Sequence, residues 1–287
     1  MSQNIYVYIM RIHPRIMDTK PLIHCSPTII KQEILDFLKV YNKSPLCNSK
    51  YVTQLYLTDM FWIYYTLKKY QPTVIIQNSI IGDGLEWLVT ELCPMSQVIS
   101  VSADINDIPY IRISFKRHYK LNNFINIDWT KELGSDFCNN TLVITTGDED
   151  VYSIVCHAFQ HNIPYLMFTN NYPTTQGNCL TLKKILSNKY HITRTNNTDE
   201  CHFHSIPSTY KSNVLNMYDY YEFPPVYLDC KITRWNDYFR EHICKLPIFE
   251  TKEDYLHLFI KTQLCYTFIC FIKIKECIPN TENNNNI

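Results

Sequence analysis

Short apolar runs alternate with amphipathic segments through the middle of the chain. A run such as Thr141–Thr145 predicts a strand, because strands of a parallel sheet are buried on both faces and are apolar throughout. The segment that begins at Val151 keeps apolar residues at the i, i+3, i+4, i+7 and i+8 positions, which predicts a helix with one buried face. This alternation predicts an α/β fold, a three-layer sandwich with a mostly parallel sheet. The predicted strands are Val74–Gln77, Gln97–Val101, Thr141–Thr145 and Tyr165–Phe168.

Additional segments flank this predicted sandwich. A helix is predicted after Ser26-Pro27, because serine is a good helix cap and proline fits the first helical position. The pattern becomes polar between 187 and 210, which predicts a loop, and the C-terminal section looks irregular. The predicted units are an N-terminal strand and helix extension (1–45), the α/β domain (46–250), and a C-terminal segment with a disordered, Asn-rich tail (251–287).

Composition narrows the possible environments and partners. The chain has 27 basic and 27 acidic residues, so it lacks the excess of positive charge that is typical of nucleic-acid binders. Twelve cysteines without a Cys-x-x-Cys pair indicate free thiols in a reducing compartment. The apolar run Leu264–Ile272 is too short to span a bilayer. We expect a cytoplasmic protein whose partner is a small molecule or another protein, and neither nucleic acid nor a membrane.

Two of the chain's five glycines, Gly82 and Gly84, lie between the predicted strand Val74–Gln77 and the helix that follows it. The first N–H groups of a helix have no partner within the helix, and they can bind a phosphate or carboxylate. This arrangement is typical of the nucleotide-binding corner of doubly wound α/β domains. The alternative is that small residues merely allow the chain to turn tightly from strand to helix.

The layout resembles class I S-adenosylmethionine-dependent methyltransferases, which have a Rossmann-like fold. More narrowly, the chain resembles a methyltransferase-like family of uncharacterised function with Asp-Asp-His after one strand and Glu-Asp-Asn-Tyr-Pro after the next. The resemblance implies that residues 46–250 form a Rossmann-like methyltransferase-like domain that binds S-adenosylmethionine. The matching segments are Val74–Leu88, Asn122–Trp129, Thr141–Asp150, Phe168–Pro173, Gly177–Lys183, Glu222–Pro225 and Thr233–Trp235. The cofactor residues that it implies are Asn78, Gly82, Gly84, Ser102 and Asp104.

The acidic positions of this family are largely replaced here. Thr146-Gly147-Asp148 stands where the family has two acids and a histidine, and Thr169-Asn170 stands where it has Glu-Asp. Ser102 stands where methyltransferases have a carboxylate for the ribose hydroxyls, with Asp104 nearby. Asparagine and threonine still form hydrogen bonds, but they cannot accept a proton as a carboxylate does. Asp148 stays a candidate catalytic base; its alternative role, with its acidic neighbours, is to stabilise a helix N-terminus.

Two further groups of residues could carry chemistry. Cys201, His202 and His204, with His191 nearby, could bind zinc, but their spacing matches no familiar zinc motif, which favours a surface cluster and no metal site. The candidate substrate-binding residues are Asn170, Asn171, Tyr172, Arg234 and Trp235. The function predicted from the sequence is a divergent methyltransferase-like protein with weak or absent activity, that is, a pseudoenzyme. The alternative is a non-catalytic binding or assembly protein on the same scaffold.

Overall fold

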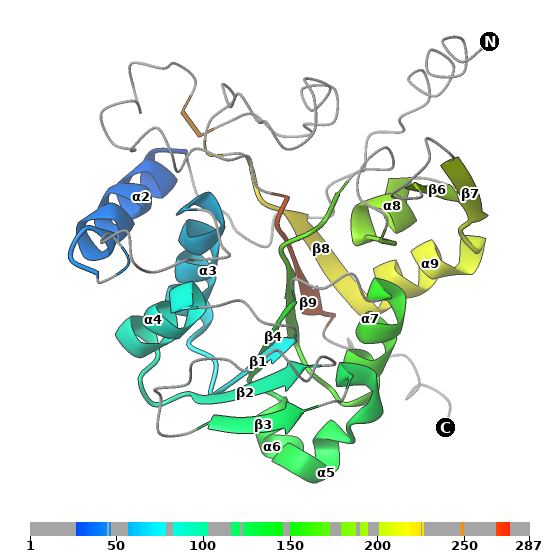
Figure 1. Cartoon of the computed structure of the whole chain (residues 1–287), viewed down its shortest axis with the longest axis horizontal. Helices are drawn as coiled ribbons and strands as arrows, with labels where there is room; N and C mark the ends of the chain where they lie inside the picture. Colours follow the sequence, from blue (N-terminus) through cyan, green and yellow to red (C-terminus); the bar gives the residue numbers. More distant parts are fainter. Residues whose placement is uncertain are drawn as a thin grey trace, which may run out of the picture.

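The computed structural model describes residues 27–44, 46, 57–78, 83–102, 116–120, 123–145, 150–172, 179–187, 190–194, 201–224, 226, 248–249 and 268–275. In these ranges one large sheet runs through the molecule, with helices on both faces (Figure 1). Its strands are β1 (Val74–Asn78), β2 (Gln97–Ser102), β3 (Lys116–Lys120), β4 (Thr141–Thr145), β5 (Tyr165–Phe168), β8 (Tyr218–Glu222) and β9 (Cys270–Ile274).

The sheet is mixed but mostly parallel. Its order is β3-β2-β1-β4-β5-β9-β8, and neighbours from β3 to β5 pair in parallel. Strand β9 is antiparallel to both β5 and β8, so β8 runs in the same direction as β5. The prediction that four apolar runs form one mostly parallel sheet is therefore confirmed. The order β3-β2-β1-β4-β5 is that of the Rossmann-like doubly wound fold.

Alternate residues of the strands pack into two separate cores, as the pleat requires. On one face, Ile75 and Leu142 pack with buried residues of α2 (Pro27–Tyr41), α3 (Leu57–Tyr70) and α4 (Asp83–Leu92). On the other, Ile76 and Val143 pack with the remaining helices. The helices of this second layer are α5 (Trp129–Leu133), α6 (Ser135–Cys138), α7 (Val151–Gln160), α8 (Leu182–Ser187) and α9 (Ser208–Met217). A short 3-10 helix, η2 (Phe124–Asn126), precedes α5.

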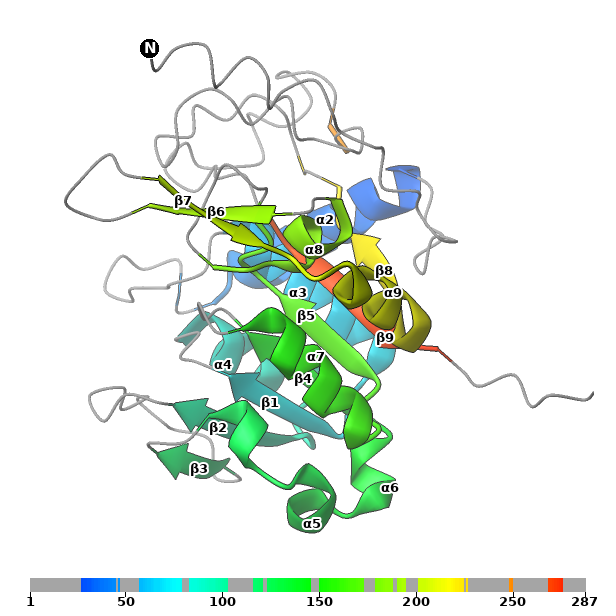
Figure 2. The same ribbon diagram turned by 90° about the vertical axis from the view of Figure 1, so that its right-hand side faces the viewer.

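Strand β9 of the large sheet, and a separate two-stranded hairpin, come from sections for which the sequence predicted little order. β9 belongs to the stretch 251–287, which was expected to form a separate C-terminal segment, yet it lies between β5 and β8. The polar stretch 187–210 was predicted to be a loop, and this is wrong for its described residues. They form an antiparallel hairpin of β6 (Tyr190–Arg194) and β7 (Cys201–Ser205), beside α8 (Figure 2).

The start of α7 shows how local sequence positions an element at the sheet edge. The Asp150 carboxylate accepts hydrogen bonds from the backbone N–H of Tyr152 at 3.0 Å and from the Ser153 hydroxyl at 2.7 Å. Asp150 is thus the N-cap of α7, in agreement with a role for this acid at a helix N-terminus. Asp148 lies outside the described residues.

His161, at the end of α7, holds the start of α5. Its Nδ1 lies 3.2 Å from the backbone nitrogen of Thr130 and 2.8 Å from the Thr130 hydroxyl, and the backbone N–H donates to it. Burial, and secondarily the neighbouring His157, lower the pKa of His161 below 6.5, while Asp128 opposes this shift. The ring therefore stays neutral in the fold and accepts the hydrogen bond.

We expect His161→Gln to reduce the loss of stability in mild acid. A lowered pKa in the folded state means that the unfolded chain takes up the proton first as the pH falls. The stabilisation from neutral His161 is therefore complete above pH 6.5 and is lost as the pH falls through the folded-state pKa. Urea unfolding at about pH 7.5 and about pH 5.5 should show a smaller decrease for the variant than for the unmodified chain. An equal decrease in both proteins would contradict this role; some dependence remains because burial also lowers the pKa of His191.

Candidate functional site

The carboxyl ends of the parallel strands meet at one edge of the sheet, which is where open α/β sheets bind ligands. Asn78, at the end of β1, is in register with Val101 of β2 and with Thr145 of β4. Thr145 is in register with Phe168, and the backbone N–H of Thr169 then donates to the carbonyl of Thr145 at 3.1 Å. This edge is the candidate functional site.

Neutral polar side chains connect the strand ends at this edge. The Asn78 amide Nδ2 donates to the Thr145 hydroxyl at 3.4 Å, and both residues are buried. The Thr169 hydroxyl donates to the Thr145 carbonyl oxygen at 3.4 Å. Each of these groups can form hydrogen bonds, but none can act as a general base at neutral pH. In the described part of this edge, the ends of β1, β4 and β5 therefore contribute no carboxylate.

A small crevice opens next to these residues, between the ends of β4 and β5 and the start of α8. It has room for about one ordered water molecule between its walls. Its walls combine hydroxyl, amide and thiol groups with apolar side chains, from Thr145, Val151, Phe168, Asn170, Asn171, Cys179, Thr181 and Leu182. Asn170 and Asn171, two of the candidate substrate-binding residues, are among the residues that line this crevice.

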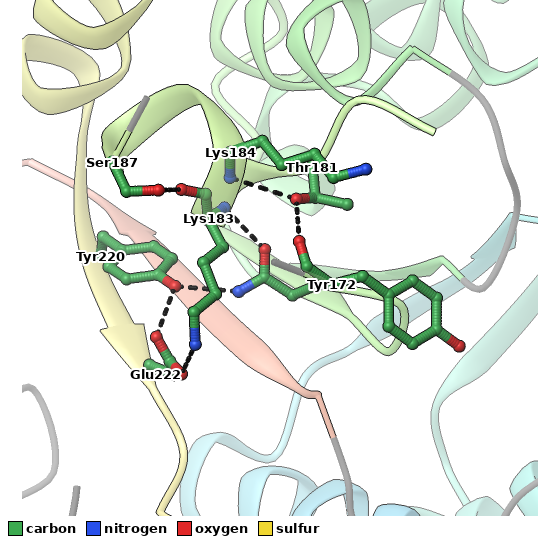
Figure 3. Close-up of polar contacts among 8 residues, drawn as sticks. Tyr172, Thr181, Lys183, Lys184, Ser187, Tyr220 and Glu222 are labelled. Atoms are coloured by element: carbon green, nitrogen blue, oxygen red, sulfur yellow. Dashed lines mark hydrogen bonds and ion pairs between the residues drawn. The ribbon is translucent and has the colours of Figure 1, made fainter. Parts of the chain in front are cut away.

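A buried polar network supports one wall of the crevice (Figure 3). The Asn171 amide donates through Nδ2 to the Tyr220 hydroxyl at 2.9 Å, and its Oδ1 accepts from the backbone N–H of Lys183 at 2.8 Å. The Lys183 ammonium contacts Glu222 Oε1 at 2.6 Å, and the Tyr220 hydroxyl donates to Glu222 Oε2 at 3.2 Å. Because β8 is parallel to β5, Glu222 ends β8 at the same edge of the sheet as Asn171.

Burial determines the chemistry of this network. It raises the pKa of the Tyr220 hydroxyl well above 10, and the neighbouring Glu222 raises it further. Tyr220 therefore stays protonated at neutral pH and acts as a hydrogen-bond donor, so it cannot serve as a phenolate base. Burial likewise raises the pKa of the Cys270 thiol well above its ordinary value, which keeps this sulfur unreactive.

A second set of hydrogen bonds fixes the other wall. The Thr181 hydroxyl donates to the carbonyl of Tyr172 at 2.6 Å and accepts from the backbone N–H of Lys184 at 3.2 Å, as the residue before α8. The fully buried Lys184 ammonium donates to the Cys179 carbonyl at 2.7 Å. The Tyr172 hydroxyl donates to Asn170 Oδ1 at 3.2 Å. These bonds connect α8 to the segment after β5 and hold the crevice in shape.

The structure places only some of the predicted site residues. Asn170 and Asn171 line the crevice, Tyr172 bonds to Asn170, and Asn78 bonds to the crevice residue Thr145. Gly84 is buried in the first turn of α4, and Ser102 is the final residue of β2. The other predicted residues lie outside the described residues: Gly82, Asp104, Asp148, Arg234 and Trp235.

Sequence reasoning gave no role to Lys183, Lys184, Tyr220 or Glu222. The segments Gly177–Lys183 and Glu222–Pro225 were among those that carried the family resemblance, and this was the available indication. No role could be assigned because Lys183 and Glu222 meet only when β8 joins the sheet through β9.

The histidines of the polar stretch occupy the β6–β7 hairpin. His191 is directly opposite His204, and Thr193 is directly opposite His202. The rings of His191 and His204 stack, with centroids 4.8 Å apart. Within the described ranges, no three histidine, cysteine or acidic side chains already form a group that could hold a metal ion.

Comparisons with known proteins give similarity of fold only. No protein-family model and no curated protein matches the sequence. An apo structure of CmcI is 14% identical, with a TM-score of 0.34 over 40% of this chain and 52% of that chain. A CmcI structure described with SAH is 15% identical, with a TM-score of 0.31 over 40% and 60%. A Listeria monocytogenes protein assigned as an S-adenosylmethionine-dependent methyltransferase is 9% identical, with a TM-score of 0.38 over 76% and 97%.

These matches extend over little more than half of each CmcI chain, so they carry no assignment of activity. None of the helices in the described ranges is both long and apolar enough to cross a membrane. The strand order β3-β2-β1-β4-β5, with helices on both faces, is that of a Rossmann-like α/β fold.

Proposed function

We propose that this chain is a divergent methyltransferase-like protein whose S-adenosylmethionine-dependent activity is weak or absent. The observation that carries the proposal is the hydrogen bond between Asn78 and Thr145, which joins the ends of β1 and β4 by two neutral side chains. Catalytic acid–base chemistry at this edge needs a group whose pKa lies near neutral. Asn78 and Thr145 have no such group.

The described residues fit the cofactor only in part. Helix α4 begins at Asp83, soon after β1 ends at Asn78, and this places the free N–H groups of a helix start next to the strand end. Ser102 ends β2, and the family resemblance implies that this is the position where methyltransferases have a carboxylate for the ribose hydroxyls. The proposed cofactor residues are Asn78, Gly82, Gly84, Ser102 and Asp104. S-adenosylmethionine would supply an activated methyl group.

The chain's own contribution to such a transfer would be the positioning of an acceptor. Methyl transfer between aligned partners depends mainly on orientation, so it can proceed without a strong base when the acceptor is already nucleophilic. Asn170, Asn171 and Tyr172, which lie at or next to the crevice, are the proposed substrate contacts, together with Arg234 and Trp235. Asp148 is the proposed base if one is needed.

A second candidate function is a non-catalytic role in binding or assembly. The observation that favours it is the use of Asn171 within the fold, because its amide contacts both Tyr220 and the backbone of Lys183. A side chain bonded in this way supports the sheet edge and contributes less to a ligand. The proposed partner is a small molecule or a protein, and not nucleic acid, because the net charge is zero.

We expect weak binding of S-adenosylmethionine and S-adenosylhomocysteine in calorimetric titrations, and tighter binding by Ser102→Asp. A hydrogen bond to a charged group contributes about 1.5–3 kcal/mol, compared with about 1 kcal/mol for a neutral one. Restoring the carboxylate should therefore tighten binding about tenfold or somewhat more. Ser102→Asn is the matched control, because it adds a similar volume without the charge.

Either of two results would contradict the proposal. Low-micromolar binding by the unmodified chain that is lost in Asp104→Ala would mean that Asp104 has replaced the missing acid and that the site is intact. Turnover of a methyl acceptor by the unmodified chain at rates typical of enzymes, on the order of 1 per second or faster, would show full activity.

A further inference from the structure

We propose that one face of the β6–β7 hairpin is a binding site for a divalent transition-metal ion, with His191 and His204 as ligands and His202 as a third. This site is separate from the crevice and does not depend on the proposed function. The imidazole ring is a preferred ligand of zinc, copper and nickel ions. Three features of the hairpin support this site: its register, the spacing of the rings, and the surroundings of their nitrogens.

The register places all three rings on one face. Directly opposed residues of an antiparallel pair point to the same side, and so do residues two apart on one strand. His191 is opposite His204, and His202 is two residues before His204. The three histidines and Thr193 therefore share a face, whereas Phe203 lies on the other. The sequence spacing alone, with twelve positions between His191 and His204, gave no indication of this pairing.

The spacing of the His191 and His204 rings suits a shared ion. A zinc–nitrogen bond is about 2.0–2.1 Å, so two imidazoles on one tetrahedral ion have ring centres about 5 Å apart. The observed centroids are 4.8 Å apart, and the planes are inclined by 20°. The centroid distance matches, but the planes are nearly parallel, so at least one ring must rotate before both rings direct a nitrogen at one ion. His202 reaches the ion only through a change of rotamer, since no group of three ligands is formed in the described ranges.

The nitrogens of both rings are prepared for a ligand. His191 Nδ1 is buried and has no hydrogen-bond partner in the structure, which is costly unless a bound group satisfies it. His204 Nε2 lies 2.9 Å from the Thr193 hydroxyl. A hydroxyl that accepts from this nitrogen fixes the tautomer and leaves Nδ1 of His204 with a free lone pair, as outer-shell partners of metal-binding histidines do.

The exposure of the hairpin face and the charge near it determine the expected affinity for the metal ion. His202 and His204 are exposed, so an ion can reach this face from solvent. The Lys184 ammonium lies near His191 and repels a second cation. We therefore expect a dissociation constant on the order of 10 µM, weaker than that of a closed structural zinc site.

Calorimetric titration of the full chain with zinc chloride tests the proposal. We expect one site that weakens at least tenfold in His191→Ala and in His204→Gln. His204→Gln keeps the size of an exposed side chain, so the hairpin should persist. His161→Gln removes a histidine far from the hairpin and should leave the affinity unchanged. Other zinc sites on free thiols would remain in every variant.

Nuclear magnetic resonance of the imidazole nitrogens gives a second measurement that needs no variant. Zinc should shift the ring nitrogens of His191 and His204 and leave those of His157 unchanged. The proposal is overturned if zinc shifts neither ring, or if the double variant His191→Ala/His204→Gln binds zinc as the unmodified chain does.

Discussion

Lys183→Met is expected to destabilise the protein by about 3 kcal/mol, because it leaves the Glu222 carboxylate without its partner in a buried site. The ammonium and the carboxylate are 2.6 Å apart, and their side chains are only 5% and 13% exposed. Removing one member of such a pair lowers stability by more than the net stabilisation that the pair provides, because the remaining charge stays buried without a partner. Urea unfolding should show the loss as a lower midpoint with an unchanged slope.

A double variant separates the charge effect from the loss of packing. Lys183→Met combined with Glu222→Gln removes both charges but keeps an acceptor for the Tyr220 hydroxyl, so we expect it to recover about 2 kcal/mol relative to Lys183→Met. Lys39→Met is the matched surface control. The Lys39–Asp36 pair is 2.9 Å apart but 69% and 40% exposed, so its loss should leave the unfolding midpoint nearly unchanged. Equal costs for Lys183→Met and Lys39→Met would mean that the buried network does not support the crevice.

Trp62→Ala and Trp129→Ala are each expected to cost about 3–5 kcal/mol, since both rings are fully buried, on opposite faces of the sheet. Trp62 stacks on Phe223 with ring centroids 4.5 Å apart, so its loss also loosens α3 from the segment after β8. Trp129 packs against Phe124 at 5.2 Å. Thermal and urea unfolding should show both losses as cooperative transitions at lower midpoints.

The two tryptophans should differ when they are replaced by phenylalanine. The Trp129 indole N–H donates to the Phe124 carbonyl at 3.1 Å, whereas Trp62 Nε1 is buried without a partner. Trp129→Phe loses a hydrogen bond as well as volume, and Trp62→Phe loses volume and removes an unsatisfied donor. We expect Trp129→Phe to lower the free energy of unfolding by about 1 kcal/mol more than Trp62→Phe does. The reason is that the Phe124 carbonyl loses the indole N–H and keeps the longer, 3.4 Å hydrogen bond from the backbone N–H of Ile127. The reverse order would mean that the Trp62 indole has a partner, such as water.

The sheet was predictable where a strand could be recognised from its own residues. β1, β2, β4 and β5 are rich in apolar residues, and each was identified. The strands β3 and β8 read Lys-Arg-His-Tyr-Lys and Tyr-Asp-Tyr-Tyr-Glu, in which charged residues hide any apolar period. Both are edge strands, and charged residues at sheet edges discourage pairing with other chains. Local pattern therefore fails at the edges for a physical reason.

The sequence indicated which edge of the sheet holds the candidate site, but it did not indicate which side chains contact one another there. Polar residues after an apolar strand located Asn170 and Asn171 at the sheet edge, because parallel strands end together. The partners of Asn171 come from α8 and β8, and the pairing of β8 is set by β9. Contacts between such distant segments have no local pattern in one sequence. The same limit applied to the hairpin, where only the register brought His191 and His204 together.

The position of β9 has a consequence for how the chain folds during synthesis. β9 pairs with β5 on one side and β8 on the other, for example Tyr165 with Lys273 and Tyr218 with Ile274. The ribosome synthesises β5 and β8 well before β9. Until β9 emerges, the edges of β5 and β8 that pair with it have no partner strand. Pairings between such distant residues also slow folding. The nascent protein thus depends on its late residues to close the sheet, and chaperones that cover exposed strand edges would act during that interval.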